Sequence, residues 1–182
     1  MKREDYISWE EFFMLMALTA AQRSKDPSSQ VGACIVDSDN RIVSVGYNGM
    51  PNGMSDEFGY GTRYVTRHIV EENFAQLDET KDAWSREGDW LDTKYPYVVH
   101  AEKNAILNAQ GRNLKGCTLY VTMLPCNDCA TMIVQSGIKK VVYVEDKYPK
   151  DDKFIAGRVI LRASGVIIEK YQPSHRKLTF EL

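Results

Sequence analysis

The first apolar pattern in the chain predicts an amphipathic helix near the N-terminus. Apolar residues recur at the i, i+3, i+4, i+7 spacing of one helical face. These residues are Trp9, Phe12, Phe13, Met16, Ala17 and Ala20. Ser8, with Glu11 three positions later, is typical of a capping box at the start of such a helix. Pro27 disfavours helical backbone at Asp26, so the helix is expected to end before this point.

The next apolar runs predict a β-hairpin. Residues 31–36 and 42–47 form two strand-like runs, separated by a short turn of aspartate, serine and asparagine. A loop is expected over residues 48–53, where two glycines and a proline occur within six positions. From about residue 54 to 92 acidic residues become frequent and β-branched residues scarce. We interpret this segment as an insertion, with one helix around residues 65–77.

After Pro96 the pattern alternates between helical and strand-like segments. The predicted helices cover residues 99–109, 126–136 and 153–163. The predicted strands cover residues 118–122, 141–144 and 166–168. Gly137 follows the second of these helices and is placed to end it. Strands that alternate with helices predict an α/β fold, with a mixed or largely parallel sheet covered by helices.

Composition and charge narrow the class of protein. The 182 residues suffice for a single domain over residues 1–182 that contains the insertion at about 54–92. The chain has no apolar run long enough to span a membrane, and its charged start does not resemble a signal peptide. Four cysteines are too few for a disulfide scaffold, so we expect a reducing, cytoplasmic location. A net charge of −2 argues against a long nucleic-acid partner.

Two short motifs contain candidate metal ligands. His100 and Glu102 stand at the start of one predicted helix, and Pro125, Cys126 and Cys129 stand at the start of the next. Cysteines three positions apart share a helical face and can reach one ion. A helix N-terminus favours thiolate over thiol, and a proline in the first turn costs no helical hydrogen bond. We therefore expect a metal site at these two helix starts.

The number of ligands indicates a catalytic rather than a structural zinc site. Two thiolates and one imidazole leave the fourth tetrahedral position open, and zinc lowers the pKa of a bound water from about 15.7 towards about 7. Glu102 is two residues from His100 and so points elsewhere, which leaves it free to move protons. Histidine-x-glutamate followed by proline-cysteine-x-x-cysteine is the signature of the zinc base deaminases.

The other cysteines and histidines carry no such pattern. Cys34 and Cys117 lie in or beside apolar runs and are expected to be buried small residues. His68 in the insertion and His175 in the C-terminal tail have no partner at ligand spacing, so we expect both at the surface.

Longer segments around these motifs resemble the deoxycytidylate (dCMP) deaminases. They are residues 22–27 (Gln-Arg-Ser-Lys-Asp-Pro), 29–36 (Ser-Gln-Val-Gly-Ala-Cys-Ile-Val), 46–53 (Gly-Tyr-Asn-Gly-Met-Pro-Asn-Gly) and 92–97 (Asp-Thr-Lys-Tyr-Pro-Tyr). The resemblance covers nearly the whole chain except residues 55–91, a segment longer than in close relatives. It implies a three-layer α-β-α sandwich with a mixed five-stranded sheet.

The resemblance also implies an activity and a substrate site. The activity is hydrolysis of dCMP to dUMP and ammonia, feeding thymidylate synthesis, with Glu102 carrying the proton to the ring and to the leaving amino group. Asn48 would bind the sugar, and backbone groups of Ala101 and Leu124 would orient the base. The residues implied near the 5′-phosphate are Arg23, Ser24, Lys25, Lys147 and Tyr148.

Many members of the family are hexamers, activated by dCTP and inhibited by dTTP. The resemblance places part of the effector site on the loop formed by Gly49, Met50, Pro51, Asn52 and Gly53. We expect a Mg2+ ion to accompany such a triphosphate. Because the insertion follows this loop directly, whether dCTP is an effector or a second substrate is left open.

Two other classes of function remain as alternatives. A polynucleotide or tRNA deaminase would use the same zinc chemistry but requires a basic face, against which the acidic insertion and the net charge argue. A non-enzymatic structural zinc or redox module requires a fourth protein ligand, and no candidate stands at ligand spacing near Cys129.

Overall fold

The computed structural model describes residues 2–54, 86–87, 90, 93–174, 177 and 179. Four helices and five strands occur within this part of the chain. In chain order they are α1 (Trp9–Ala21), β1 (Gly32–Val36), β2 (Ile42–Tyr47), α3 (Ala101–Asn108), β3 (Thr118–Met123), α4 (Asn127–Gln135), β4 (Lys140–Glu145), α5 (Asp152–Ala163) and β5 (Ile167–Lys170). Each matches a predicted element, with ends that shift by a few residues. The helix expected around residues 65–77 lies outside the described residues.

The five strands form one mixed sheet in the order β2-β1-β3-β4-β5. Strand β1 is antiparallel to both β2 and β3, whereas β4 runs parallel to β3 and β5. The predicted hairpin is therefore confirmed as β1 and β2, and the alternating second half supplies the parallel strands. Gly137 ends α4 with a positive φ of 82°, as its position predicts.

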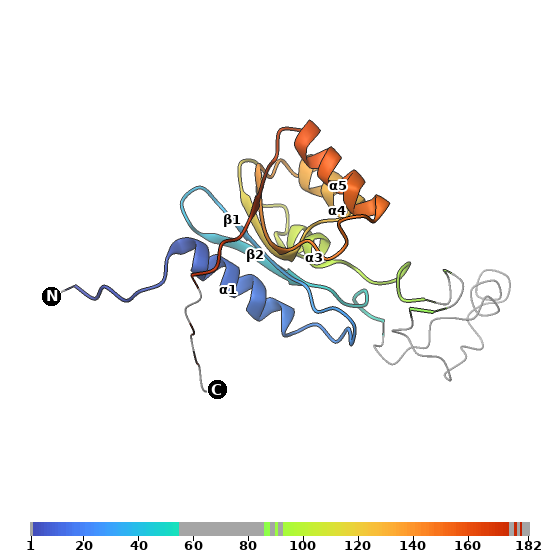
Figure 1. Ribbon diagram of the computed structural model, residues 1–182, viewed down its shortest axis with the longest axis horizontal. Helices are drawn as coiled ribbons and strands as arrows, with labels where there is room; N and C mark the ends of the chain where they lie inside the picture. Colours follow the sequence, from blue (N-terminus) through green and yellow to red (C-terminus); the bar gives the residue numbers. More distant parts are fainter. Residues whose placement is uncertain are drawn as a thin grey trace.

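Helices cover both faces of the sheet and make three layers (Figure 1). Helix α1 lies on one face, and α3, α4 and α5 lie on the other. Alternate residues of β1 serve the two cores: Ala33 and Ile35 face α3 and α4, whereas Cys34 and Val36 face α1. This burial on both faces confirms the three-layer α-β-α sandwich.

Helix α1 begins at the predicted capping box but buries a slightly different face. Glu11 N donates to Ser8 Oγ at 3.1 Å, and Ser8 N donates to Glu11 Oε2 at 2.7 Å. The prediction that Trp9 belongs to the buried face is wrong, since Trp9 is 59% exposed and its ring stacks on Phe13 at the surface. Met14, outside the predicted face, is 1% exposed instead. The buried face of α1 is the one that packs on the sheet, and it consists of Phe13, Met14, Ala17 and Ala21.

Two glycines allow helices of the site to approach neighbouring backbone closely. A Cβ at Gly46 of β2 would lie 2.3 Å from Ala105 N and 2.4 Å from Ala101 O, so α3 rests directly on this strand. A Cβ at Gly157 of α5 would lie 2.6 Å from Pro125 O, at the approach to α4. Side chains at these positions would push α3 or the start of α4 away.

Side chains from α3 and the turn after it bind the outer carbonyl oxygens of β2. Asn104 Nδ2 donates to Tyr47 O at 2.7 Å, and Asn108 Nδ2 donates to Val45 O at 2.9 Å. Arg112 NH1 reaches Val43 O at 3.4 Å. Since β2 is an edge strand, these contacts fasten α3 along the open side of the sheet.

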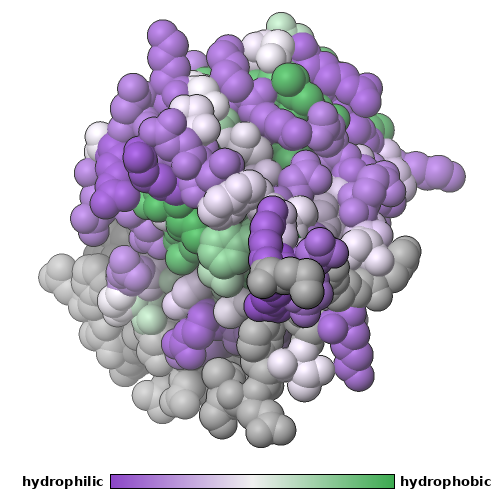
Figure 2. Space-filling view, turned by 90° about the vertical axis from the view of Figure 1, so that its left-hand side faces the viewer, coloured by the Kyte–Doolittle hydropathy of each residue, from purple (hydrophilic) through white to green (hydrophobic). Residues whose placement is uncertain are grey.

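Hydrophilic residues cover most of the face shown in Figure 2, where apolar residues form small separate areas. Among the described residues, no helix has the length and apolar character that crossing a membrane requires.

Candidate active site

His100, Cys126 and Cys129 converge at the starts of α3 and α4. His100 Nδ1 lies 3.5 Å from Cys126 Sγ and 3.3 Å from Cys129 Sγ. The three ligand atoms all lie within 4.8 Å of one another. Tetrahedral zinc with ordinary bond lengths would place an imidazole nitrogen and a thiolate sulfur about 3.6 Å apart. The separations therefore fit one zinc ion held by these three side chains.

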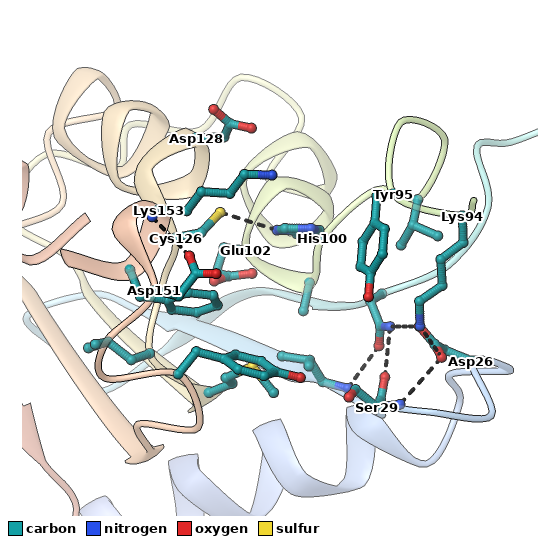
Figure 3. A pocket seen from close by; sticks show the side chains of 18 of the residues that line it. Asp26, Ser29, Lys94, Tyr95, His100, Glu102, Cys126, Asp128, Asp151 and Lys153 are labelled. Carbon is teal, nitrogen blue, oxygen red and sulfur yellow. Dashed lines mark hydrogen bonds and ion pairs between the residues drawn. The ribbon is translucent and has the colours of Figure 1, made fainter. Parts of the chain in front are cut away.

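The local backbone explains why these side chains are available to a metal. His100 and Cys126 are the N-cap residues of α3 and α4, and both have extended backbone. An N-cap side chain often bonds to its own helix, but neither of these makes such a bond. Both side chains turn towards each other instead (Figure 3). Cys129 joins them from the first turn of α4.

The cluster favours a thiolate even before a cation binds. Hydrogen bonding from Cys129, and then from His100, lowers the pKa of Cys126 to about 3. The hydrogen bond to Cys126 in turn raises the pKa of His100 above its ordinary value. The Cys129 thiol next to this thiolate has a raised pKa, and a coordinated cation would deprotonate it.

Glu102 lies beside the ligands in the first turn of α3 and is only 4% exposed (Figure 3). Burial raises the pKa of its carboxyl above the ordinary value. A carboxyl with a raised pKa binds a proton more readily than a free one, which suits a group that accepts a proton and then returns it in general acid–base catalysis.

A cavity of about 480 Å³ opens onto these groups. His100, Glu102 and Cys126 line one end, and Asp26 and Ser29 line the other (Figure 3). Asn48 also lines the cavity, and its side chain donates to both Asp26 and Ser29. The volume lies within the range of small-molecule sites, which runs from about 300 to 1,000 Å³.

A buried ion pair forms part of the wall opposite the metal ligands. Lys94 Nζ lies 2.6 Å from Asp26 Oδ1, and the side chains are 7% and 3% exposed. Asp26 also accepts from the backbone N–H groups of Ser28 and Ser29. This pair ties the loop after α1 to the segment that leads into His100.

Asn48, predicted to bind the sugar, lines this cavity and is held by three hydrogen bonds. Its Oδ1 accepts from Val31 N at 2.8 Å, and its Nδ2 donates to Ser29 O and to Asp26 Oδ2. Both amide hydrogens are therefore in use, while the oxygen keeps a second lone pair for a ligand hydroxyl.

The structure divides the other predicted substrate residues among different places. Ala101, Leu124 and Tyr148 line the cavity that contains Glu102. Lys147 is not a lining residue, but its Nζ donates at 2.9 Å to the Oγ of Ser29, which is one. Ser24 Oγ instead accepts from Asp26 N within the loop.

Arg23 and Lys25 line a second cavity of about 210 Å³ rather than the first. The residues of the predicted effector loop line it with them: Gly49, Met50, Pro51, Asn52 and Gly53. Tyr47 and Met54 complete the wall. The two cations are thus placed beside the predicted effector loop, and their assignment to the substrate phosphate stays a prediction.

Several cavity residues were not among the predicted set. They are Asp26, Ser29, Val31, Arg86, Trp90, Lys94, Tyr95, Val98, Met123, Asp128, Asp151, Lys153 and Phe154. Asp26, Ser29, Lys94 and Tyr95 belong to segments that carry the family resemblance, so a residue-by-residue comparison could have found them. Arg86 and Trp90 come from the segment interpreted as an insertion, which offered no such signal.

The remaining cysteines fit their predicted structural role. Cys34 is fully buried, and burial raises the pKa of its thiol to about 12. Cys117 is 3% exposed. His68 and His175 lie outside the described residues.

This sheet, with a histidine and two cysteines at two helix starts beside a buried glutamate, defines a zinc-dependent nucleobase deaminase. The family model "Cytidine and deoxycytidylate deaminase zinc-binding region" matches residues 7–145. The chain belongs to this family and, within it, to the deoxycytidylate deaminases. It is 45% and 46% identical to the deoxycytidylate deaminases of Mus musculus and Homo sapiens over 180 residues, which are 99% of this chain and 89% of each relative.

A solved structure supports the same family. The dCMP deaminase of the cyanophage S-TIM5, determined in complex with dCMP and dUMP, has a TM-score of 0.64 and is 28% identical. The match covers 91% of this chain and all of that one. The expected fold and family are therefore both confirmed.

Proposed function

We propose that this chain catalyses the hydrolytic deamination of dCMP to dUMP and ammonia. The observation that carries the proposal is the approach of three zinc ligands within 4.8 Å beside the buried Glu102. The substrate follows from the similarity to deoxycytidylate deaminases along nearly the whole chain. In the cell the product would supply thymidylate synthesis, and we expect a cytoplasmic location.

The proposed mechanism assigns one task to each part of the cavity. Zinc held by His100, Cys126 and Cys129 would supply an activated water for attack on carbon 4 of cytosine. Glu102 accepts one proton from that water and delivers it to ring nitrogen 3. It then takes the second proton from the new carbon-4 hydroxyl and delivers it to the amino group, which leaves as ammonia. Backbone groups of Ala101 and Leu124 orient the base, and Asn48 Oδ1 accepts from a sugar hydroxyl.

The proposal predicts a specific substrate and metal requirement. The zinc-loaded chain should release ammonia from dCMP, and removal of zinc by a chelator should abolish the release until zinc is restored. The measurement is ammonia release from dCMP, dCTP, CMP and deoxycytidine, each with and without added dCTP or dTTP. If zinc-loaded protein leaves dCMP intact under all these conditions, the substrate assignment fails. Turnover of dCTP itself would indicate a dual-specificity enzyme.

We also propose that the second cavity binds a triphosphate effector. Arg23 and Lys25 bring two cationic side chains next to Gly49–Gly53 in a cavity of about 210 Å³. A triphosphate needs cations and hydrogen-bond donors, and a Mg2+ ion would accompany it. The expectations of dCTP activation, dTTP inhibition and a hexamer come from the family resemblance. The substrate panel above tests the effectors, and light scattering measures the oligomer.

A further inference from the structure

The charges in the catalytic cavity are divided between its two ends. Asp128, Asp151 and Lys153 lie at the end with the metal ligands, whereas Lys94 and Asp26 lie at the other (Figure 3). Lys153 offsets only one of the two carboxylates at the metal end, so these three side chains carry a net negative charge that would repel a phosphate group. A nucleotide whose base faces Glu102 is therefore expected to extend its 5′-phosphate towards the opposite end.

At that opposite end the Asp26 carboxylate is fully engaged. It pairs with Lys94 and accepts from the N–H groups of Ser28 and Ser29 and from Asn48. Lys94 is thus the cation that pairs directly with Asp26 inside the wall. A further cation at this end is expected to bond to another group.

Arg86 is such a cation. It lines the cavity, and its Nε donates to the Tyr95 hydroxyl at 3.0 Å. The pKa of its guanidinium lies above the ordinary value, first because of this hydrogen bond and then because Tyr148 and Asp26 lie within electrostatic range. A guanidinium has five N–H donors, and the bond to Tyr95 uses one of them.

Lys147 is a second cation near the same place. Its Nζ lies 2.9 Å from Ser29 Oγ and 5.6 Å from the centre of the Tyr148 ring. Both Ser29 and Tyr148 line the cavity. A hydroxyl group of the cavity wall thus binds each cation, Tyr95 for Arg86 and Ser29 for Lys147. Their two positive charges match a phosphate of about −2.

We propose that Arg86 is a specificity-determining residue that binds the substrate's 5′-phosphate together with Lys147. The proposal rests on the proposed function and adds to it a residue from the 54–92 segment. The planar fork of an arginine suits bidentate contact with phosphate oxygens. Arg86 therefore contributes to substrate binding, because it lines the cavity that contains Glu102.

The test compares Arg86→Gln with the unsubstituted chain on dCMP and on deoxycytidine, which lacks the phosphate. We expect the KM for dCMP to rise about 10- to 100-fold, with kcat within threefold. The kcat/KM for deoxycytidine, or its inhibition constant if it is not turned over, should stay within twofold. Arg41→Gln is the matched control, because Arg41 pairs with Asp39 at the surface and does not line either cavity.

Two more variants separate phosphate binding from a structural role. Arg86→Lys keeps the charge and should recover part of the lost affinity for dCMP. Tyr95→Phe removes the hydroxyl that holds Arg86 and should raise the KM less than Arg86→Gln does. Equal losses for dCMP and deoxycytidine, or no change for dCMP, would overturn the role of Arg86. If the unsubstituted chain fails to deaminate dCMP, the proposed function fails instead.

Discussion

Glu102→Gln is expected to lower kcat for dCMP by about 10²- to 10⁴-fold, the usual contribution of a general acid–base group. Glutamine keeps the size and hydrogen-bonding shape of the side chain but cannot accept the proton of the attacking water. Since Glu102 is not one of the three ligands, zinc should remain bound at His100, Cys126 and Cys129. The measurement is steady-state kinetics together with zinc content by atomic absorption.

Cys129→Ser provides the matched comparison for Glu102→Gln. It weakens a ligand, so both activity and zinc content should fall. If Glu102→Gln also lost its zinc, Glu102 would belong to the ligand set and the proton-transfer role would be wrong. Full activity with zinc retained would equally contradict it.

Lys94→Met is expected to reduce the free energy of unfolding by about 3–5 kcal/mol, because it leaves the Asp26 carboxylate buried without its cation. For a domain of this size, each kcal/mol corresponds to about 2–4 °C in Tm. The melting temperature should therefore fall by roughly 6–20 °C, measured by calorimetry or circular dichroism on zinc-loaded protein.

Two further variants serve as controls for Lys94→Met. The double variant with Asp26→Asn removes both charges and should be more stable than Lys94→Met alone. Arg41→Met breaks the exposed pair with Asp39 and should cost under about 1 kcal/mol. An unchanged melting temperature for Lys94→Met would show that the buried pair does not hold the two segments together.

Local patterns were sufficient to predict most of the fold. The capping box at Ser8 and Glu11 involves residues only three positions apart, and the glycine after α4 acts on the helix directly before it. Such short-range features can be recognised from the spacing of residues in the sequence. The two metal motifs were predictable for the same reason, since each places its ligands at one helix start. The approach of the two motifs in space followed from the α/β fold, which the alternation of helical and strand-like periodicity predicted.

Contacts between distant segments could not be predicted in this way. Lys94 and Asp26 are 68 residues apart, and nothing in either local sequence indicates that they pair. The family resemblance implies that Arg23 and Lys25 lie near the 5′-phosphate, and no local pattern indicates that they line the cavity of the effector loop. Arg86 belongs to the segment interpreted as an insertion, outside the motifs that carry the family resemblance, so only the fold shows that it lines the substrate cavity.

The contacts between α3 and β2 bear on how copies of this chain can associate. A strand from another chain would need the carbonyl oxygens of Val43, Val45 and Tyr47 as acceptors. Asn104, Asn108 and Arg112 already occupy them. A continuous intermolecular sheet through this edge is therefore disfavoured, and so is the edge-to-edge aggregation that exposed strands promote. The helix that carries Glu102 thus also disfavours pairing of β2 with strands from other copies of the chain.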